Sequence, residues 1–239
     1  MIGLGGGVRL LGRMFRIFYQ NIKASYQITK MPVPIVAILG ASMAKQEESY
    51  VQDARLLARK LVEQKVSIVT GGGTGIMEAA NQGALEANSL EKRSFGIAVG
   101  AFNLKNNPFL ADTINVDYYL VRKVILLNYA SGYIFFPGGF GTLDELFEII
   151  TMLKSKQVEL YRINENELPK QLPIILLGKE FWQPLLDWII NFPLKNNLIC
   201  DEDIEMLHIT DDLDEVVQII KERCFSVEMK RQKIHTVIR

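Results

Sequence analysis

The sequence predicts one α/β domain built on a doubly wound, mostly parallel sheet with helices on both faces. Five short apolar runs are typical of strands buried on both sides of a parallel sheet: Ile35–Leu39, Val66–Thr70, Phe95–Val99, Tyr133–Phe136 and Ile174–Leu177. Helical patterns separate or follow these runs: Tyr50–Gln64, Ile76–Ala87, Tyr118–Ala130, Leu143–Leu153, Phe181–Asn191 and Leu213–Arg223. Such alternation implies right-handed crossovers and a Rossmann-like sheet in a single domain.

The composition is that of a globular enzyme and argues against nucleic acid and membranes as partners. The 239 residues suffice for one sizeable domain. Lys and Arg number 27 and Asp and Glu also number 27, which argues against binding of nucleic acid or membranes by bulk electrostatics. Cys200 and Cys224 form no C-x-x-C pair, and neither a membrane-spanning apolar run nor a signal-peptide pattern occurs. We therefore expect a cytoplasmic protein.

Positive charge is concentrated at the N-terminus. Residues 1–46 carry basic but no acidic side chains: Arg9, Arg13, Arg16, Lys23, Lys30 and Lys45. Apolar residues recur near helical spacing over Arg9–Ile28, and a basic amphipathic helix of this kind could lie on a membrane surface. Because charged helix faces are usually just solvated, we favour a helix packed on the domain with its basic side in water. We do not expect membrane contact from it.

Two glycine-rich segments follow predicted strands and open predicted helices: Gly71–Gly75 and Pro137–Thr142. Glycines let the backbone approach an anion closely, and the N–H groups at a helix start then hold a phosphate. In an open parallel sheet such loops gather at the carboxyl edge of the strands. Neither loop is a Walker A motif, and the first departs from G-x-G-x-x-G spacing. One such loop alone could be a turn without a ligand, but two in one domain favour a nucleotide site.

The second loop carries a family signature. Residues 137–145 read PGGFGTLDE and resemble the PGGxGTxxE signature of the LOG ("Lonely Guy") family. These phosphoribohydrolases release cytokinin bases from riboside monophosphates and were long labelled lysine decarboxylases. The chain looks most like their bacterial relatives, the nucleotide-monophosphate nucleosidases. Supporting matches run from about Ile35 to about Asp212 and include Gly71–Glu78, the Arg122-Lys123 pair, Gly178–Trp182 and Leu185–Asp187.

One departure from the family pattern concerns the segment after the first strand. Relatives often have Gly-Ser-Ala-Arg there, whereas this chain reads GASM over residues 40–43. Met43 therefore stands where the arginine is expected, and Ser42 or Lys45 is left to supply that contact. The stretch Phe102–Asp112 matches nothing familiar, so base preference does not carry over from the family.

The resemblance implies a hydrolase that cleaves the N-glycosidic bond of nucleoside 5′-monophosphates, AMP or a cytokinin riboside monophosphate, to free base and ribose 5-phosphate. The cationic, oxocarbenium-like ribose of such a reaction calls for a carboxylate. We assign Glu145 to activate water or stabilise that cation, and Arg122 to orient Glu145 or the phosphate. The predicted substrate-binding residues are Ser42, Gly72, Gly73, Thr74, Glu78, Lys123, Gly138, Gly139, Gly141 and Thr142.

Each catalytic assignment has a structural alternative. Thr142-x-x-Glu145 is also a capping box, in which the glutamate merely satisfies a backbone N–H. Arg122 could form an ordinary salt bridge, and Asp144 is favourable at a helix start without any catalytic part. Phe140 could stack on the base or simply pack.

The prediction for the whole chain has three parts: an N-terminal helical extension (residues 1–33), a nucleotide-binding catalytic domain (34–225) and a C-terminal tail (226–239). A polar surface insertion is expected at Glu159–Gln171. We expect no metal and no organic cofactor, no nucleic-acid partner, and a homodimer or higher homo-oligomer by resemblance. The alternative function is a non-catalytic nucleotide-binding or molybdenum-cofactor carrier protein of the same fold.

Overall fold

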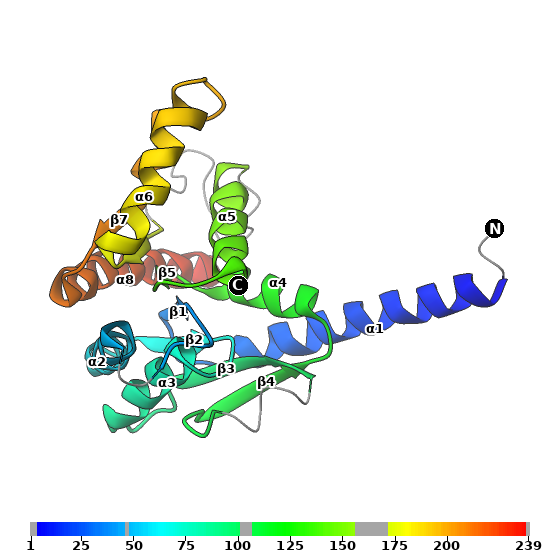
Figure 1. The fold of residues 1–239 in the computed structure, drawn as a ribbon. Coiled ribbons are helices and arrows are strands. Elements are labelled where there is room, and N and C mark those ends of the chain that lie inside the picture. Colours follow the sequence, from blue (N-terminus) through cyan, green and yellow to red (C-terminus); the bar gives the residue numbers. More distant parts are fainter. Residues whose placement is uncertain (1–3, 46–47, 101–106, 156–171, 238–239) are drawn as a thin grey trace.

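A seven-stranded parallel sheet forms the centre of the computed structural model, which describes residues 4–45, 48–100, 107–155 and 172–237 (Figure 1). The strand order is β4-β3-β2-β1-β5-β6-β7, and every neighbouring pair is parallel. The strands are β1 (Ile35–Leu39), β2 (Ser67–Thr70), β3 (Ser94–Val99), β4 (Asp112–Val116), β5 (Gly132–Phe135), β6 (Ile174–Leu177) and β7 (Leu207–Thr210). The predicted doubly wound α/β fold is confirmed.

Helices cover both faces of the sheet and bury a separate core on each. One face carries α1 (Leu4–Ile28), α4 (Tyr119–Tyr129) and α5 (Phe140–Lys154); the other carries α2 (Ser49–Glu63), α3 (Ile76–Glu86) and α8 (Leu213–Val237). Alternate residues of β1 serve the two cores, Ala37 the first and Val36 and Ile38 the second. Near β7 lie α6 (Lys179–Ile189) and α7 (Asp201–Glu205), and α6 continues into the π-helical segment η3 (Ile190–Leu194).

The sequence found the buried strands and missed the two edge strands. The five predicted strands lie within a residue of β1, β2, β3, β5 and β6. Strand β4 alternates exposed and buried positions and β7 is mostly half-buried, so neither reads as a continuous apolar run. The predicted insertion Glu159–Gln171 lies outside the described residues.

The buried contacts between α1 and the domain lie in the C-terminal half of the helix. Ala24 and Ile28 are buried in the first core, and Gln20 exchanges hydrogen bonds with Asp117. The N-terminal half projects beyond the sheet (Figure 1). No helix in the described parts of the chain is long and apolar enough to cross a membrane.

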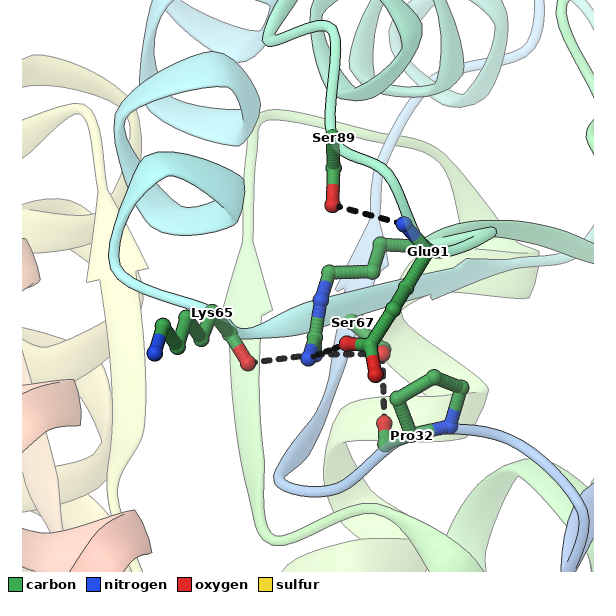
Figure 2. Close-up of polar contacts among 6 residues, drawn as sticks. Pro32, Lys65, Ser67, Ser89 and Glu91 are labelled. Atoms are coloured by element: carbon green, nitrogen blue, oxygen red, sulfur yellow. Dashed lines mark hydrogen bonds and ion pairs between the residues drawn. The ribbon is translucent and has the colours of Figure 1, made fainter.

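A closed polar cluster ties together the amino ends of β2 and β3 (Figure 2). The Arg93 guanidinium is 6% exposed and donates to the Lys65 carbonyl, to Ser67 Oγ and to the Glu91 carboxylate. Ser67 in turn donates its hydroxyl proton to the Pro32 carbonyl. This buried cation is therefore surrounded by acceptors, as burial of a charge requires.

Candidate active site

The candidate site lies where the direction of the winding reverses. From β1 the chain proceeds outward to β2 on one side and later returns to β5 on the other. Loops that follow strands on either side of such a switch point diverge, and ligands of open α/β sheets bind between them. A cavity of about 480 Å³ occupies this place, a volume typical of small-molecule sites. Its walls are the loops after β1, β2 and β5, the first turn of α4 and the first two turns of α5.

Backbone hydrogen bonds join the loop after β1 to both glycine loops. Ala41 donates its N–H to the Pro137 carbonyl at 3.0 Å, and its own carbonyl accepts from the Ile76 N–H at 3.1 Å. Thr74 Oγ1 donates to the Ser42 carbonyl at 2.7 Å. The start of α3 is therefore partly capped by protein, so the first loop is a wall of the cavity more than an open anion cradle.

Two glycines of the first loop are required by close packing. Gly75 has φ +65°, and a Cβ there would lie 2.3 Å from the Ala41 carbonyl oxygen. A Cβ at Gly71 would lie 3.0 Å from Cζ of Arg122. Larger residues would push away the β1 loop in the first case and the arginine in the second.

A buried amide network that sequence reasoning missed supports this loop from below. Asn81 Oδ1 accepts from Thr70 Oγ1 at 2.7 Å and from Asn107 Nδ2 at 3.0 Å. Asn107 Nδ2 also donates to the Gly73 carbonyl at 3.0 Å. The signal was present, because Asn81 lies on the apolar face of α3, where a buried amide needs partners.

The second loop leaves the start of α5 open. Gly138 is needed because an added Cβ would lie 2.2 Å from Thr142 Oγ1. Gly139 and Gly141 have no positive φ, and a Cβ at either would meet nothing within 4 Å. Gly139 is the N-cap of α5 and makes no side-chain cap, so the first N–H groups of the helix are available to an anion in the cavity.

An ion pair between α4 and α5 occupies one wall of the cavity. Arg122 Nη2 lies 3.2 Å from Glu145 Oε1, with the two side chains 13% and 9% exposed. The Arg122 guanidinium also lies 5.2 Å from the ring centre of Tyr119, while its buried Nε has no hydrogen-bond partner. Burial raises the pKa of Glu145 above its ordinary value, although Arg122 opposes that shift.

The capping-box interpretation of Thr142 and Glu145 is wrong. Helix α5 begins at Phe140, three residues earlier than the sequence pattern indicates, with Gly139 as its N-cap. Thr142 is therefore inside the first turn, and Glu145 lies beyond it, bonded to Arg122. A carboxylate at that position does not cap the helix.

The structure brings together most, not all, of the predicted site residues. Those that line the cavity are Ser42, Gly73, Thr74, Arg122, Gly139, Gly141, Thr142 and Glu145. Those outside its lining are Gly72, Glu78, Lys123 and Gly138. Met77, Tyr119 and Phe140 line it without having been assigned there as binding residues. The roles of all these residues as ligand contacts remain predictions.

Two of the outlying residues have other surroundings. Lys123 Nζ lies 2.8 Å from Asp144 and 2.8 Å from Glu148, so it clamps α4 to α5. Burial lowers the pKa of Lys123, but these two carboxylates outweigh it and the pKa is raised. Glu78 is half-buried in the first turn of α3, and burial raises its pKa.

The position of the family's missing arginine is exposed. Met43 is 93% exposed and does not line the cavity, whereas its neighbour Ser42 does. Of the two suggested substitutes, Lys45 is also outside the lining. Among the residues that the structure describes, no group of three His, Cys, Asp or Glu side chains is placed to hold a metal.

Fold and site together define a doubly wound α/β protein with an uncapped helix start and a buried Arg–Glu pair at its switch point. Residues 77–220 match the sequence model of the family described as "Possible lysine decarboxylase". The chain belongs to this family.

Relatives of known name cover the chain only in part. A pyrimidine/purine nucleotide 5′-monophosphate nucleosidase of Escherichia coli is 27% identical over 74% of this chain and 37% of its own length. A cytokinin riboside 5′-monophosphate phosphoribohydrolase of Arabidopsis thaliana is 30% identical over 52% of this chain and 54% of its own. The chain thus spans between about a third and just over half the length of these curated relatives.

A solved structure shares the fold. The molybdenum cofactor binding protein of Rippkaea orientalis superposes with a TM-score of 0.58 at 21% identity, covering 81% of this chain and 98% of that one.

Proposed function

We propose that this protein hydrolyses the N-glycosidic bond of nucleoside 5′-monophosphates, giving free base and ribose 5-phosphate. The observation that carries the proposal is the buried Arg122–Glu145 pair beside the open N-terminus of α5, in one cavity. A protein that only bound an anion would gain nothing from a carboxylate next to it, because like charges repel. The names of the relatives point to the same reaction.

The phosphate belongs at the start of α5 in this proposal. Gly139 and Gly141 leave room for its oxygens to reach the backbone, since a Cβ at either position would meet no protein atom within 4 Å. The positive end of the helix dipole and the free N–H groups favour a dianion there. The ribose then extends toward Glu145, one and a half turns further along the same helix.

Glu145 acts on water and on the ribose. Its carboxylate takes a proton from a water molecule whose oxygen bonds to C1′, while the C1′–N bond breaks and its electron pair goes to the base. The base nitrogen takes up a proton from solvent and Glu145 later releases its proton to solvent, so water is divided between the two products. The same negative charge stabilises the cationic ribose as the bond lengthens. Arg122 orients Glu145 by its hydrogen bond, and its guanidinium lines the same cavity, where it can contact a substrate oxygen.

The test is product analysis with AMP, GMP, CMP and isopentenyladenosine monophosphate. Purified protein is incubated with each nucleotide, and free base and ribose 5-phosphate are separated by chromatography. We expect release of base by the native chain and its loss in Glu145→Gln. Asp144→Asn is the matched control at a pH above the acid limb of the rate profile, because it makes the same chemical change one residue away on a side chain that is 58% exposed and outside the cavity lining. Tight nucleotide binding without any release would favour the carrier alternative.

We further propose a cytoplasmic homodimer or higher homo-oligomer that binds no nucleic acid. The family resemblance supports the assembly, and the zero net charge argues against nucleic acid. Light scattering during size-exclusion chromatography measures the mass directly, and a monomer at micromolar concentration would contradict the proposed assembly.

A further inference from the structure

Helix α1 has a second apolar face that the domain does not use. Its inner side is marked by Ala24 and Ile28, which are buried in the first core. Residues two apart on a helix point about 200° away from each other, so Ile22 faces away from the side that Ala24 buries. A stripe of large side chains follows on that outer side, each between 56% and 71% exposed: Val8, Leu11, Phe15, Phe18 and Ile22.

The residues of this outer stripe are contiguous and are not isolated exposed apolar side chains. Single exposed apolar residues are normal on a soluble protein, whereas contiguous ones mark an interaction site. The stripe repeats at intervals of three and four residues, which keeps its members on one side of the helix. Tyr19 and Tyr26, 65% and 63% exposed, widen it along one border. The basic side of α1 is in water, as the sequence favoured, and an apolar side is turned to solvent as well.

The charges beside the stripe indicate what covers it. No acidic residue occurs in Leu4–Ile28. Arg9, Arg16 and Lys23 recur every seven residues and so form one basic line along the helix. Asp117 of the domain pairs with Arg16 at 2.6 Å. Because Arg16 already has a carboxylate partner in the domain, an apolar surface with negative charge would complement the stripe together with Arg9 and Lys23.

A lipid surface meets both requirements better than a second α1. Two stripes packed on each other would bring two basic lines together, with no acidic residue on either helix to separate them. An anionic bilayer offers hydrocarbon to the phenylalanines and headgroup charge to the arginines and lysine. The domain packs on the opposite side of α1, and acidic charge of the domain further than about 10 Å from the lipid would be screened by salt.

We propose that α1 is a peripheral membrane anchor that lies flat on an anionic lipid surface through its outer stripe. This inference does not depend on the proposed hydrolase activity. It assigns the projecting half of α1 a partner of defined chemistry, a negatively charged bilayer interface.

Vesicle flotation of the full chain tests the anchor. We expect the protein to float with vesicles of phosphatidylcholine and phosphatidylglycerol, to float poorly with phosphatidylcholine alone, and to be released by salt. The double change Phe15→Ser and Phe18→Ser should abolish flotation. Arg9→Gln and Lys23→Gln should each weaken binding by about fivefold.

The control is Leu90→Ser, a fully exposed leucine outside α1, which should float like the native chain. All these side chains are exposed, so unchanged thermal unfolding checks that each variant folds. Absence of flotation with anionic vesicles would overturn the proposal, as would equal flotation of the phenylalanine variant. An oligomer that dissociates on the phenylalanine change, without any vesicle binding, would assign the stripe to a second copy instead.

Discussion

Arg93 and Arg122 are both buried, but they lie at the amino and carboxyl edges of the same sheet and have different polar surroundings. Arg93 precedes β3 and donates to a backbone carbonyl, a hydroxyl and a carboxylate (Figure 2). Arg122 faces the cavity at the carboxyl edge, pairs with Glu145 at 3.2 Å, and keeps a buried Nε without a partner.

Under the proposed function, the difference separates a structural cation from one that serves the substrate. A buried charge is stable when its donors are satisfied, as they are around Arg93. At Arg122 the fold tolerates an unfilled donor and a carboxylate whose pKa burial raises. Buried donors without a hydrogen-bond partner and carboxylates with a perturbed pKa are typical of functional sites. The comparison predicts that changes at Arg93, at the amino edge, affect stability, and that changes at Arg122, at the carboxyl edge, affect the rate of the reaction.

The largest effect is expected from Glu145→Gln. The amide cannot take a proton from water and carries no charge to stabilise the ribose cation. We expect kcat to fall by about 10²–10⁴-fold, with nucleotide affinity retained. Steady-state kinetics and isothermal titration measure the two quantities. An unchanged kcat would remove Glu145 from the chemistry and with it the contrast between the two edges.

Arg122→Lys should follow, with a loss of about 10²-fold in kcat/KM. Lysine keeps the positive charge but lacks the planar guanidinium that can serve Glu145 and a substrate oxygen at once. Because the charge next to Glu145 persists, we expect little change in the free energy of unfolding. Urea unfolding alongside the kinetics checks this. A large destabilisation with normal kinetics would show that Arg122, like Arg93, has a structural role only.

Arg93→Met should give the converse result. The change leaves the Lys65 carbonyl and the Ser67 hydroxyl without their donor, which we expect to lower the free energy of unfolding by about 1–3 kcal/mol. No effect on kcat/KM is expected, since the residue lies at the far edge of the sheet from the cavity. Reduced activity in the folded variant would show that the two edges are coupled.

A smaller effect is expected from pH. Because the pKa of Glu145 is raised in the fold, its contribution to stability is fully present below the ordinary glutamate pKa and is lost as the pH rises through the raised value. The stability of the native chain relative to Glu145→Gln should therefore decline over that window. Activity should run the other way and fall on acidification, because the carboxylate is the working form. Unfolding and rate profiles at matched pH values test both directions.

The central strands and the pairing partners Arg122 and Glu145 could be picked out from the sequence, because each depends on local pattern. Continuous apolar runs predicted β1 and β6 to the residue, and the nine-residue signature led to Glu145. The edge strands β4 and β7 were missed because they are only partly buried. The support of Gly73 by Asn107 could not be predicted either, since the contact joins residues 34 apart in sequence and depends on how the loops fold over one another.

Lys123 shows the same limit and leads to the smallest effect. Adjacent in sequence to Arg122, it was assigned to the substrate, yet it bridges Asp144 and Glu148 outside the cavity lining. Lys123→Met should therefore change kcat/KM by only a few-fold, well below the effect of losing a direct contact.

The Lys123 cation lowers the pKa of Glu145, whereas Asp144 raises it. Lys123→Met should thus move the acid limb of the rate profile to higher pH, and Asp144→Asn should move it to lower pH. Shifts in opposite directions would establish that both residues act on the rate through Glu145. A large rise in KM for Lys123→Met would instead show that Lys123 contacts the substrate.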